Sequence, residues 1–122
     1  MEHYIILLQI KPGHEQEVAD YYRALEEDLN KAPGFRGRQL FLAQRGRMAS
    51  ELLTVYTRED LDKDPEPPHE DAGTQLVVIE NWDTSKQRLE FSKAVSGKRK
   101  TSIVPYLLPE HSHEFYTNLA EE

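Results

Sequence analysis

Two short segments of this chain are apolar at almost every position, and they limit the possible folds more than any other feature. The segments are Tyr4 to Ile10 and Gln75 to Trp82, and both are rich in branched aliphatic residues. Successive side chains of a strand point to opposite faces, so a strand that is apolar on both faces must be covered from both sides. We therefore predict two central strands of a sheet that is covered on both faces.

Helical patterns lie between these strands and after them. From Glu15 to Lys31, apolar residues recur at helical spacing, and Ala32-Pro33-Gly34 ends the pattern. A second helix is predicted to begin after Thr84, an N-cap with Gln87 three residues on, and to end at Gly97. The remaining expected elements are two outer strands and a short helical turn, over Phe35 to Gln44, Glu114 to Asn118 and Ser102 to Leu108. Alternation along the first outer strand predicts that Phe35 and Phe41 lie on the face of the sheet opposite to that of Leu40.

The resulting order is βαββαβ, which indicates an α+β fold of the ferredoxin-like type in one domain covering residues 1–122. An insertion over residues 45–73 interrupts the connection between the second and third strands. Its first part fits a short helix or a strand, and Asp60 to Gly73 is acidic and proline-rich, which predicts an exposed, mobile loop. Because two helices cover only one sheet face, we expect the other apolar face to pair with a second copy in a homodimer.

Composition excludes several classes of function. The chain has no cysteine, so disulfides, thiolate metal sites and cysteine nucleophiles are ruled out. Its net charge is −7, which disfavours nucleic-acid binding, and no apolar run approaches the ~20 residues of a membrane span. The N-terminus runs into an apolar segment without a basic stretch before it, so we expect a cytoplasmic protein.

Short motifs at the element boundaries carry a family resemblance. They are Lys11-Pro12-Gly13, Ala32-Pro33-Gly34-Phe35-Arg36-Gly37, Glu80-Asn81-Trp82 with Asp83-Thr84-Ser85 behind it, and Glu114-Phe115-Tyr116. With these motifs the chain resembles the antibiotic biosynthesis monooxygenase family of the dimeric α/β-barrel superfamily. The resemblance implies a dimeric barrel. Members of this family include cofactor-free oxygenases that act on phenolic or quinol polyketides, and haem-degrading enzymes.

The resemblance also bears on single residues. It implies that Trp82 stands beside the ligand cleft, whereas core packing at a strand end is the alternative. Haem degraders of this superfamily use a histidine from the helix after the third strand, and residues 83–108 contain none. They also use an asparagine on the first strand, where this chain has Gln9. Haem degradation by that route is therefore not expected.

The other polar candidates are two amides and two histidines. Gln9 and Asn81 interrupt apolar strands, where they would line a cleft and hydrogen-bond a substrate, or else cap the edge of the sheet. His111 and His113 are two residues apart and face the same side of an extended strand. That spacing fits a shared metal, acid–base roles or a solvated edge, and no third ligand is evident to complete a metal site.

These candidates lead to two hypotheses. The first is a cofactor-independent monooxygenase acting on an aromatic, phenolic or quinol small molecule, without metal, flavin or haem. In it His113 or His111 is the general base, and Trp82, Asn81 and Gln9 bind the substrate. The alternative is a non-catalytic dimeric protein, stress-related or binding a small hydrophobic ligand in the same cleft.

Overall fold

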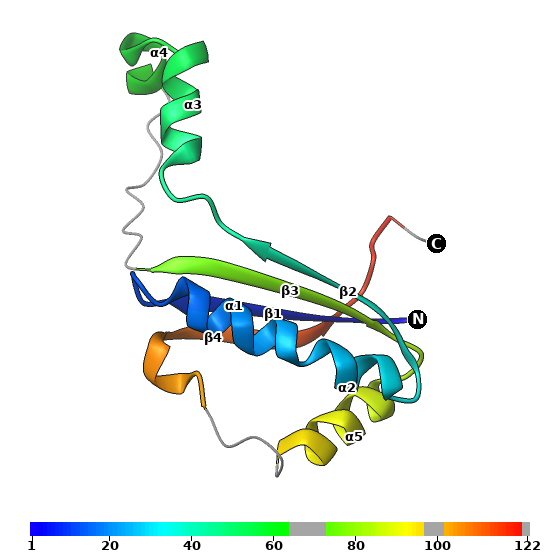
Figure 1. Cartoon of the computed structure of the whole chain (residues 1–122). Coiled ribbons are helices and arrows are strands. Elements are labelled where there is room, and N and C mark those ends of the chain that lie inside the picture. Colours follow the sequence, from blue (N-terminus) through cyan, green and yellow to red (C-terminus); the bar gives the residue numbers. More distant parts are fainter. Residues whose placement is uncertain (64–72, 97–101, 121–122) are drawn as a thin grey trace.

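The helices over residues 15–31 and 85–96 lie on one side of a four-stranded sheet in the computed structural model, which describes residues 1–63, 73–96 and 102–120 (Figure 1). The elements are β1 Glu2–Ile10, α1 Glu15–Ala24, α2 Glu26–Lys31, β2 Phe35–Leu42, α3 Arg47–Val55, α4 Arg58–Lys63, β3 Thr74–Trp82, α5 Ser85–Ser96, the 3₁₀ turn η1 Val104–Tyr106 and β4 Leu107–Tyr116. No helix within the described ranges is long and apolar enough to cross a membrane.

The sheet confirms the predicted ferredoxin-like α+β arrangement. Its strand order is β2-β3-β1-β4, and every neighbouring pair is antiparallel. The two segments that are apolar on both faces, β1 and β3, are therefore the central strands, as predicted. The sheet is open, with β2 and β4 at its edges.

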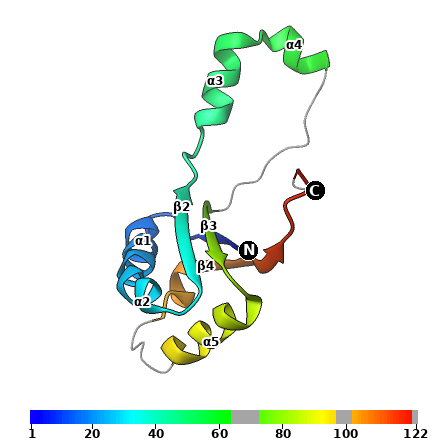
Figure 2. The same cartoon turned by 90° about the vertical axis from the view of Figure 1, so that its right-hand side faces the viewer.

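One face of the sheet, which we call the covered face, carries the hydrophobic core. Alternate residues of both central strands are buried there, and α1, α2 and α5 pack over them (Figures 1 and 2). The core residues are Tyr4, Ile6, Leu8, Ile10, Leu76, Val78 and Trp82 from the strands and Val18, Tyr22, Leu29 and Phe91 from the helices. The helical stripe predicted between Glu15 and Lys31 thus faces the sheet, although a turn at Leu25 divides the helix into α1 and α2.

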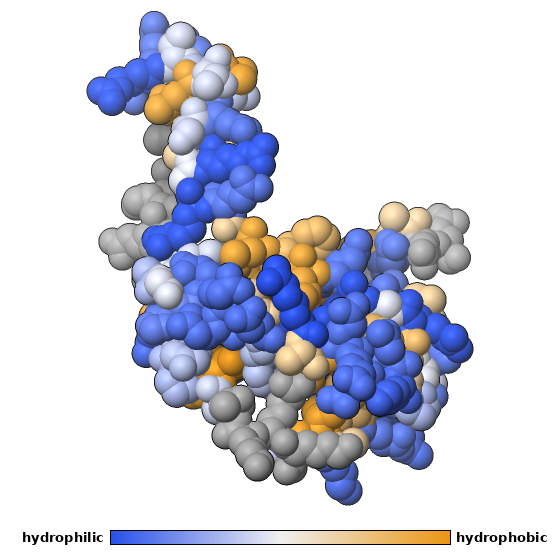
Figure 3. Space-filling view, viewed as in Figure 1, coloured by the Kyte–Doolittle hydropathy of each residue, from blue (hydrophilic) through white to orange (hydrophobic). Residues whose placement is uncertain are grey.

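The opposite face, which we call the open face, bears no helix of the described chain. Ile5, Leu7, Val77 and Ile79 lie on it and are only half-buried. Phe41 of β2 is on the same face and is 50% exposed. An apolar patch is visible over β2 and β3 beside the foot of α3 (Figure 3). The prediction that these strands are apolar on both faces is confirmed, and helices of this chain cover only one of them.

A β-bulge corrects the predicted faces of β2. Phe35 pairs with Trp82, but the next pair joins Gly37 to Asn81, so one extra residue enters β2. Gly37 has a φ of 134°, a conformation that suits glycine at a bulge. The extra residue moves the residues before the bulge to the other face of the sheet. Phe35 therefore lies on the covered face, as Leu40 does, and not on the face opposite Leu40 as predicted. The strand also ends at Leu42, short of the predicted Gln44.

The last strand begins earlier than predicted. β4 runs over Leu107–Tyr116, not over Glu114 to Asn118, and it pairs with β1 along its length, with one irregularity between Leu8 and Ile10. Its polar residues give this strand little apolar alternation, so the sequence pattern does not show where it begins. Its limits are set by its backbone hydrogen bonds to β1. The helical turn predicted over Ser102 to Leu108 is the shorter η1.

The insertion contains two helices, which we call the arm, from Arg47 to Lys63. The segment that fitted either a helix or a strand is the helix α3. The loop predicted from Asp60 to Gly73 is corrected in part, because α4 extends to Lys63; residues 64–72 lie outside the described residues. The arm projects away from the sheet and its packed helices (Figures 1 and 2).

Candidate functional site: a cavity on the covered face

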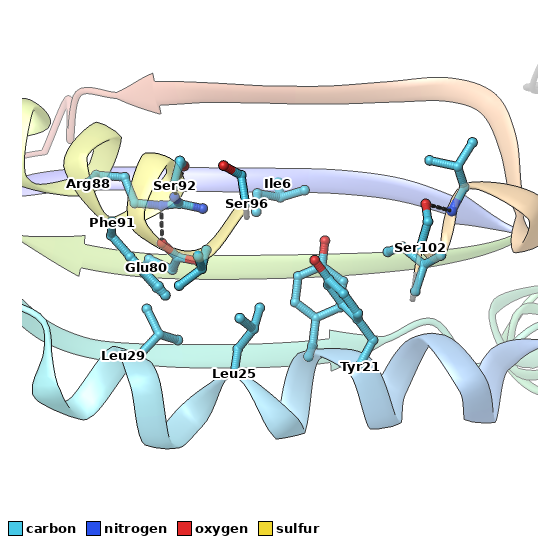
Figure 4. Close-up of a pocket in the computed structure, with 14 residues that line it drawn as sticks. Ile6, Tyr21, Leu25, Leu29, Glu80, Arg88, Phe91, Ser92, Ser96 and Ser102 are labelled. Carbon is cyan, nitrogen blue, oxygen red and sulfur yellow. Dashed lines mark hydrogen bonds and ion pairs between the residues drawn. The ribbon is translucent and has the colours of Figure 1, made fainter. Parts of the chain in front are cut away.

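A cavity of about 410 Å³ lies between the helices and the covered face of the sheet (Figure 4). Its apolar walls come from β1, α1, α2 and α5 and from the segment that enters η1, and they include Ile6, Leu25, Leu29, Phe91, Val95, Ile103 and Val104. Its polar groups are Tyr21, Tyr22, Glu80, Arg88, Ser92, Ser96 and Ser102. A cavity that combines apolar walls with convergent polar groups is typical of a small-molecule site.

A buried ion pair forms the polar centre of this cavity. Glu80 is on the covered face of β3 and is 2% exposed. Arg88 comes from α5, directly after that strand, and its Nε lies 2.6 Å from Glu80 Oε1. Trp82 Nε1 donates a hydrogen bond to the same carboxylate oxygen at 2.9 Å. Arg88 Nε has no hydrogen-bond partner of acceptable geometry among the described residues, so its contact with Glu80 is an ion pair only.

Aromatic rings hold the Arg88 guanidinium in place. Its Cζ lies 4.3 Å from the centre of the Tyr4 ring and 5.6 Å from that of Phe91. One of its terminal nitrogens donates to the hydroxyl of Ser92, one turn further along α5. Cation–π contacts of this kind stabilise a charge that is removed from water. The guanidinium is therefore fixed beside the cavity and does not swing in solvent.

A second arginine adds positive charge next to Glu80. Arg38 on β2 is the strand partner of Glu80, and its Nη1 donates to the backbone oxygen of Tyr22 at 2.7 Å. Burial lowers the pKa of Arg38, and the nearby Glu80 carboxylate opposes that shift. Two guanidinium groups thus lie near one buried carboxylate, and of the two only Arg88 lines the cavity.

Two adjacent tyrosines stand on the α1 side of the cavity. The rings of Tyr21 and Tyr22 meet edge to face, with centres 5.2 Å apart. Figure 4 shows Tyr21 reaching from α1 toward the sheet. Burial raises the pKa of Tyr22 far above its ordinary value, so its hydroxyl stays protonated near neutral pH. Tyr22 therefore offers a hydrogen-bond donor but not a general base.

The three predicted substrate-binding residues do not share one cavity. Trp82 is fully buried in the core and contacts the rings of Phe35 and Phe91, at 5.3 and 5.7 Å. Asn81 and Gln9 lie on the open face, where Asn81 Oδ1 accepts a hydrogen bond from His3 Nδ1 at 2.6 Å. The sheet thus separates both amides from Trp82, whose polar contact supports Glu80.

The two predicted catalytic histidines stand at the edge of the covered face. On β4, His111 pairs with Leu8 and His113 with Ile6, and both histidines are exposed. The ring of His113 lies 6.4 Å from that of Tyr4, which also contacts the Phe115 ring and the Arg88 guanidinium. Neither histidine lines the cavity. Within the described ranges, no group of three side chains could bind a metal ion.

Sequence reasoning missed the ion pair at the centre of the cavity. The family motif that contains Glu80 does not indicate that its carboxylate is paired, and no sequence motif includes Arg88. The available signal was a carboxylate inside an apolar strand, because such a group is almost always paired when it is buried. An arginine in the helix that follows the strand is an obvious partner for it.

Comparison with known proteins gives structural relatives only. No family model and no curated protein match the sequence. A putative antibiotic biosynthesis monooxygenase from Nitrosomonas europaea superposes with a TM-score of 0.63 at 12% identity, over 98% of this chain and 91% of that chain. A second antibiotic biosynthesis monooxygenase superposes with a TM-score of 0.59 at 18% identity, over 98% and 99% of the two chains. The chain has the fold of the antibiotic biosynthesis monooxygenases.

Another structural relative binds a porphyrin, so the cavity residues of this chain are compared with the needs of a haem iron. A mutant of MhuD with two manganese protoporphyrin IX molecules per active site has a TM-score of 0.59 at 12% identity, over 98% of this chain and 95% of that chain. Here no histidine lines the cavity. Glu80 is paired with Arg88, and the raised pKa of Tyr22 disfavours its phenolate. The cavity residues therefore do not fit a haem iron.

Proposed function

We propose that this protein binds an aromatic small molecule with an acidic hydroxyl in the covered-face cavity and oxygenates it with dioxygen alone. The observation that carries the proposal is the Arg88 guanidinium, held on aromatic rings beside an apolar cavity, with an Nε that has an ion pair but no hydrogen bond. A fixed cation in a site of low dielectric strongly stabilises an anion.

The chemistry starts from a phenol or quinol whose oxygen faces Arg88. The guanidinium lowers the pKa of the bound hydroxyl, and the resulting electron-rich anion reduces dioxygen directly. When the substrate carries an activated CH₂ group, two C–H bonds break and one C=O bond forms. One oxygen atom enters the product and the other leaves as water, so dioxygen is the only oxidant.

The proton of the substrate also needs an acceptor. We propose His113 as the base, acting through bridging water, because it lies on the covered face beside Tyr4 but outside the cavity lining. In this proposal Arg88 governs binding of the anion, and His113 governs the rate of proton removal. His113→Ala should therefore slow oxygen uptake and leave the dissociation constant of the ligand unchanged.

Ligand binding tests the role of Arg88. A panel of quinols and anthrone-like phenols is titrated while fluorescence is followed from Trp82, the single tryptophan, which contacts the cavity residues Glu80 and Phe91. Arg88→Gln should weaken binding by about 10- to 100-fold, as expected for the loss of a charged hydrogen-bond donor. Glu80→Gln should tighten binding, because it removes the negative charge beside Arg88. The matched control is Arg36→Gln, which removes an exposed arginine paired with Asp83.

Oxygen uptake by the same mixtures separates the two hypotheses. Uptake that depends on a bound phenol supports the oxygenase. Binding without uptake supports the non-catalytic ligand-binding protein. If no phenol or quinol binds, or if Arg88→Gln and Arg36→Gln behave alike, the proposal for this cavity is wrong.

The open face supports a second part of the proposal, a homodimer. Its half-buried apolar side chains form a surface of the kind that usually marks an interface. Sedimentation at micromolar concentration should give about 28 kDa, twice the chain mass of 14.2 kDa. Ile79→Lys, in the middle of this face, should produce a folded monomer. A wild-type protein that sediments as a monomer would contradict the dimer.

A further inference from the structure

The helix α3 of the arm is amphipathic, and its apolar side is exposed. At 100° per residue, its apolar residues fall on one side of the helix, and Arg47, Ser50, Glu51 and Thr54 fall on the other. Met48 and Val55 are each 75% exposed, and Leu53 is 65% exposed. An amphipathic helix in a folded protein normally turns its apolar side toward another element. Leu52 on this side is half-buried, but among the described residues the rest of the side lacks the cover that its pattern indicates.

The length of α3 makes that cover necessary. The helix has nine residues, and isolated helices shorter than about 12–15 residues are marginal in water. Most helical stability in proteins comes from packing of the apolar side. The arm projects from the body of the molecule, so packing on its own sheet does not supply this stability (Figures 1 and 2).

The position of the arm points to a second copy of this chain as the partner. The arm follows β2, whose last residues Phe41 and Leu42 are 50% and 45% exposed. A hollow of about 320 Å³ at its foot is lined by Leu42, Gln44, Arg47, Met48 and Glu51. The apolar patch beside this foot continues onto β2 and β3 (Figure 3). A molecule that pairs with the open face therefore meets the arm as well.

The size of the open face supports the same partner. Four strands of eight to ten residues, spaced about 4.8 Å apart, make a face with a flat area of roughly 600 Å². A stable interface buries about 800 Å² of accessible surface on each partner, and contact with the arm would add to the area that the sheet supplies. A bilayer surface is a poorer candidate, because anionic lipids would repel a chain with a net charge of −7.

We infer that the arm of each copy packs its apolar α3 side against the second copy and completes the dimer interface. This inference rests on the proposed open-face dimer and adds a separate contact to it. The sheet faces then bring the two copies together, and the arms supply the additional buried apolar surface.

Sedimentation equilibrium tests the contribution of the arm. The double variant Met48→Gln with Val55→Gln changes two exposed side chains and places a good helix former at both positions, so the monomer should stay folded. Its dimer dissociation constant should rise by about tenfold or more, because buried apolar surface is lost. The matched control is Leu89→Gln on α5, a leucine that is 57% exposed and away from both the arm and the open face. It should dissociate like the wild type.

A labelling experiment separates failure of the arm from failure of the dimer. The chain has no cysteine, so Leu53→Cys and Leu89→Cys each accept one spin label. The label at position 53 should lose mobility as the protein concentration passes through the dimer range, and the label at 89 should stay mobile. A dimer in which both labels stay mobile and the double variant dissociates normally overturns the arm contact alone. A wild-type monomer overturns the arm contact and the dimer together.

Discussion

Val77 and Val78 are neighbours on β3 with identical side chains, but they lie on opposite faces of the sheet. Val78 is fully buried beneath the helices, whereas Val77 is half-buried on the open face. The polar neighbours Glu80 and Asn81 on the same strand also lie on opposite faces. Glu80 is buried beside Arg88, and Asn81 contacts His3 on the open face. The chain therefore covers one face with its own helices and leaves the apolar side chains of the other face half-buried.

The largest effect on stability should come from Glu80→Ala. This substitution leaves Arg88 largely buried without its partner, and breaking a buried ion pair in this way costs about 3 kcal/mol or more in the free energy of unfolding. The matched control is Asp83→Ala, which breaks the exposed Arg36–Asp83 pair and should leave that free energy almost unchanged. Urea unfolding at low protein concentration compares the two variants. Equal losses would mean that Glu80 is not buried as described.

The two valines provide the next comparison. Val78→Ala should lower the free energy of unfolding by about 2 kcal/mol, because two methyl groups are lost and a cavity remains. Val77→Ala should cost less than about 1 kcal/mol in the monomer, because its side chain is only half-buried. At high protein concentration the dimer should make the Val77→Ala loss larger. A concentration-independent loss would weaken the case for pairing through the open face.

A smaller effect is expected for Asn81→Ala. The substitution removes the hydrogen bond from His3 and should cost about 1 kcal/mol in the free energy of unfolding. Because Asn81 is on the open face, ligand binding in the cavity should not change. A loss of ligand affinity in this variant would restore Asn81 to the substrate-binding role that the sequence indicated.

The smallest effect concerns Tyr22 and appears only in alkali. Burial raises the pKa of this hydroxyl, so the unfolded chain ionises first, near pH 10, while the folded chain stays neutral. The stability that this adds is fully present below about pH 10 and decreases as the pH rises further. Titration of phenolate absorbance should show a late component that Tyr22→Phe removes. An unchanged late component would place Tyr22 nearer to water.

The sequence alone determined the frame of this protein. Two strands that are apolar on both faces must be central, whatever surrounds them, because no other position buries both sets of side chains. The apolar stripe of the helix after Glu15 and the N-cap at Thr84 also depend only on residues close in the sequence. At the N-cap, the backbone N–H of Gln87 donates a hydrogen bond to the Thr84 hydroxyl at 3.2 Å. These predictions were correct because each depends on a few neighbouring residues.

Tertiary structure decided the contents of the site. The bulge at Gly37 changed the side of Phe35, and pairing with β1 set the limits of a polar β4 that showed little pattern. The ion pair of Glu80 and Arg88 required the turn after β3 to fold α5 back over the covered face. Alternation along β3 then placed Glu80 on that face and Asn81 on the other. A sequence pattern reports the periodicity of one element, whereas a cavity depends on how several elements pack together.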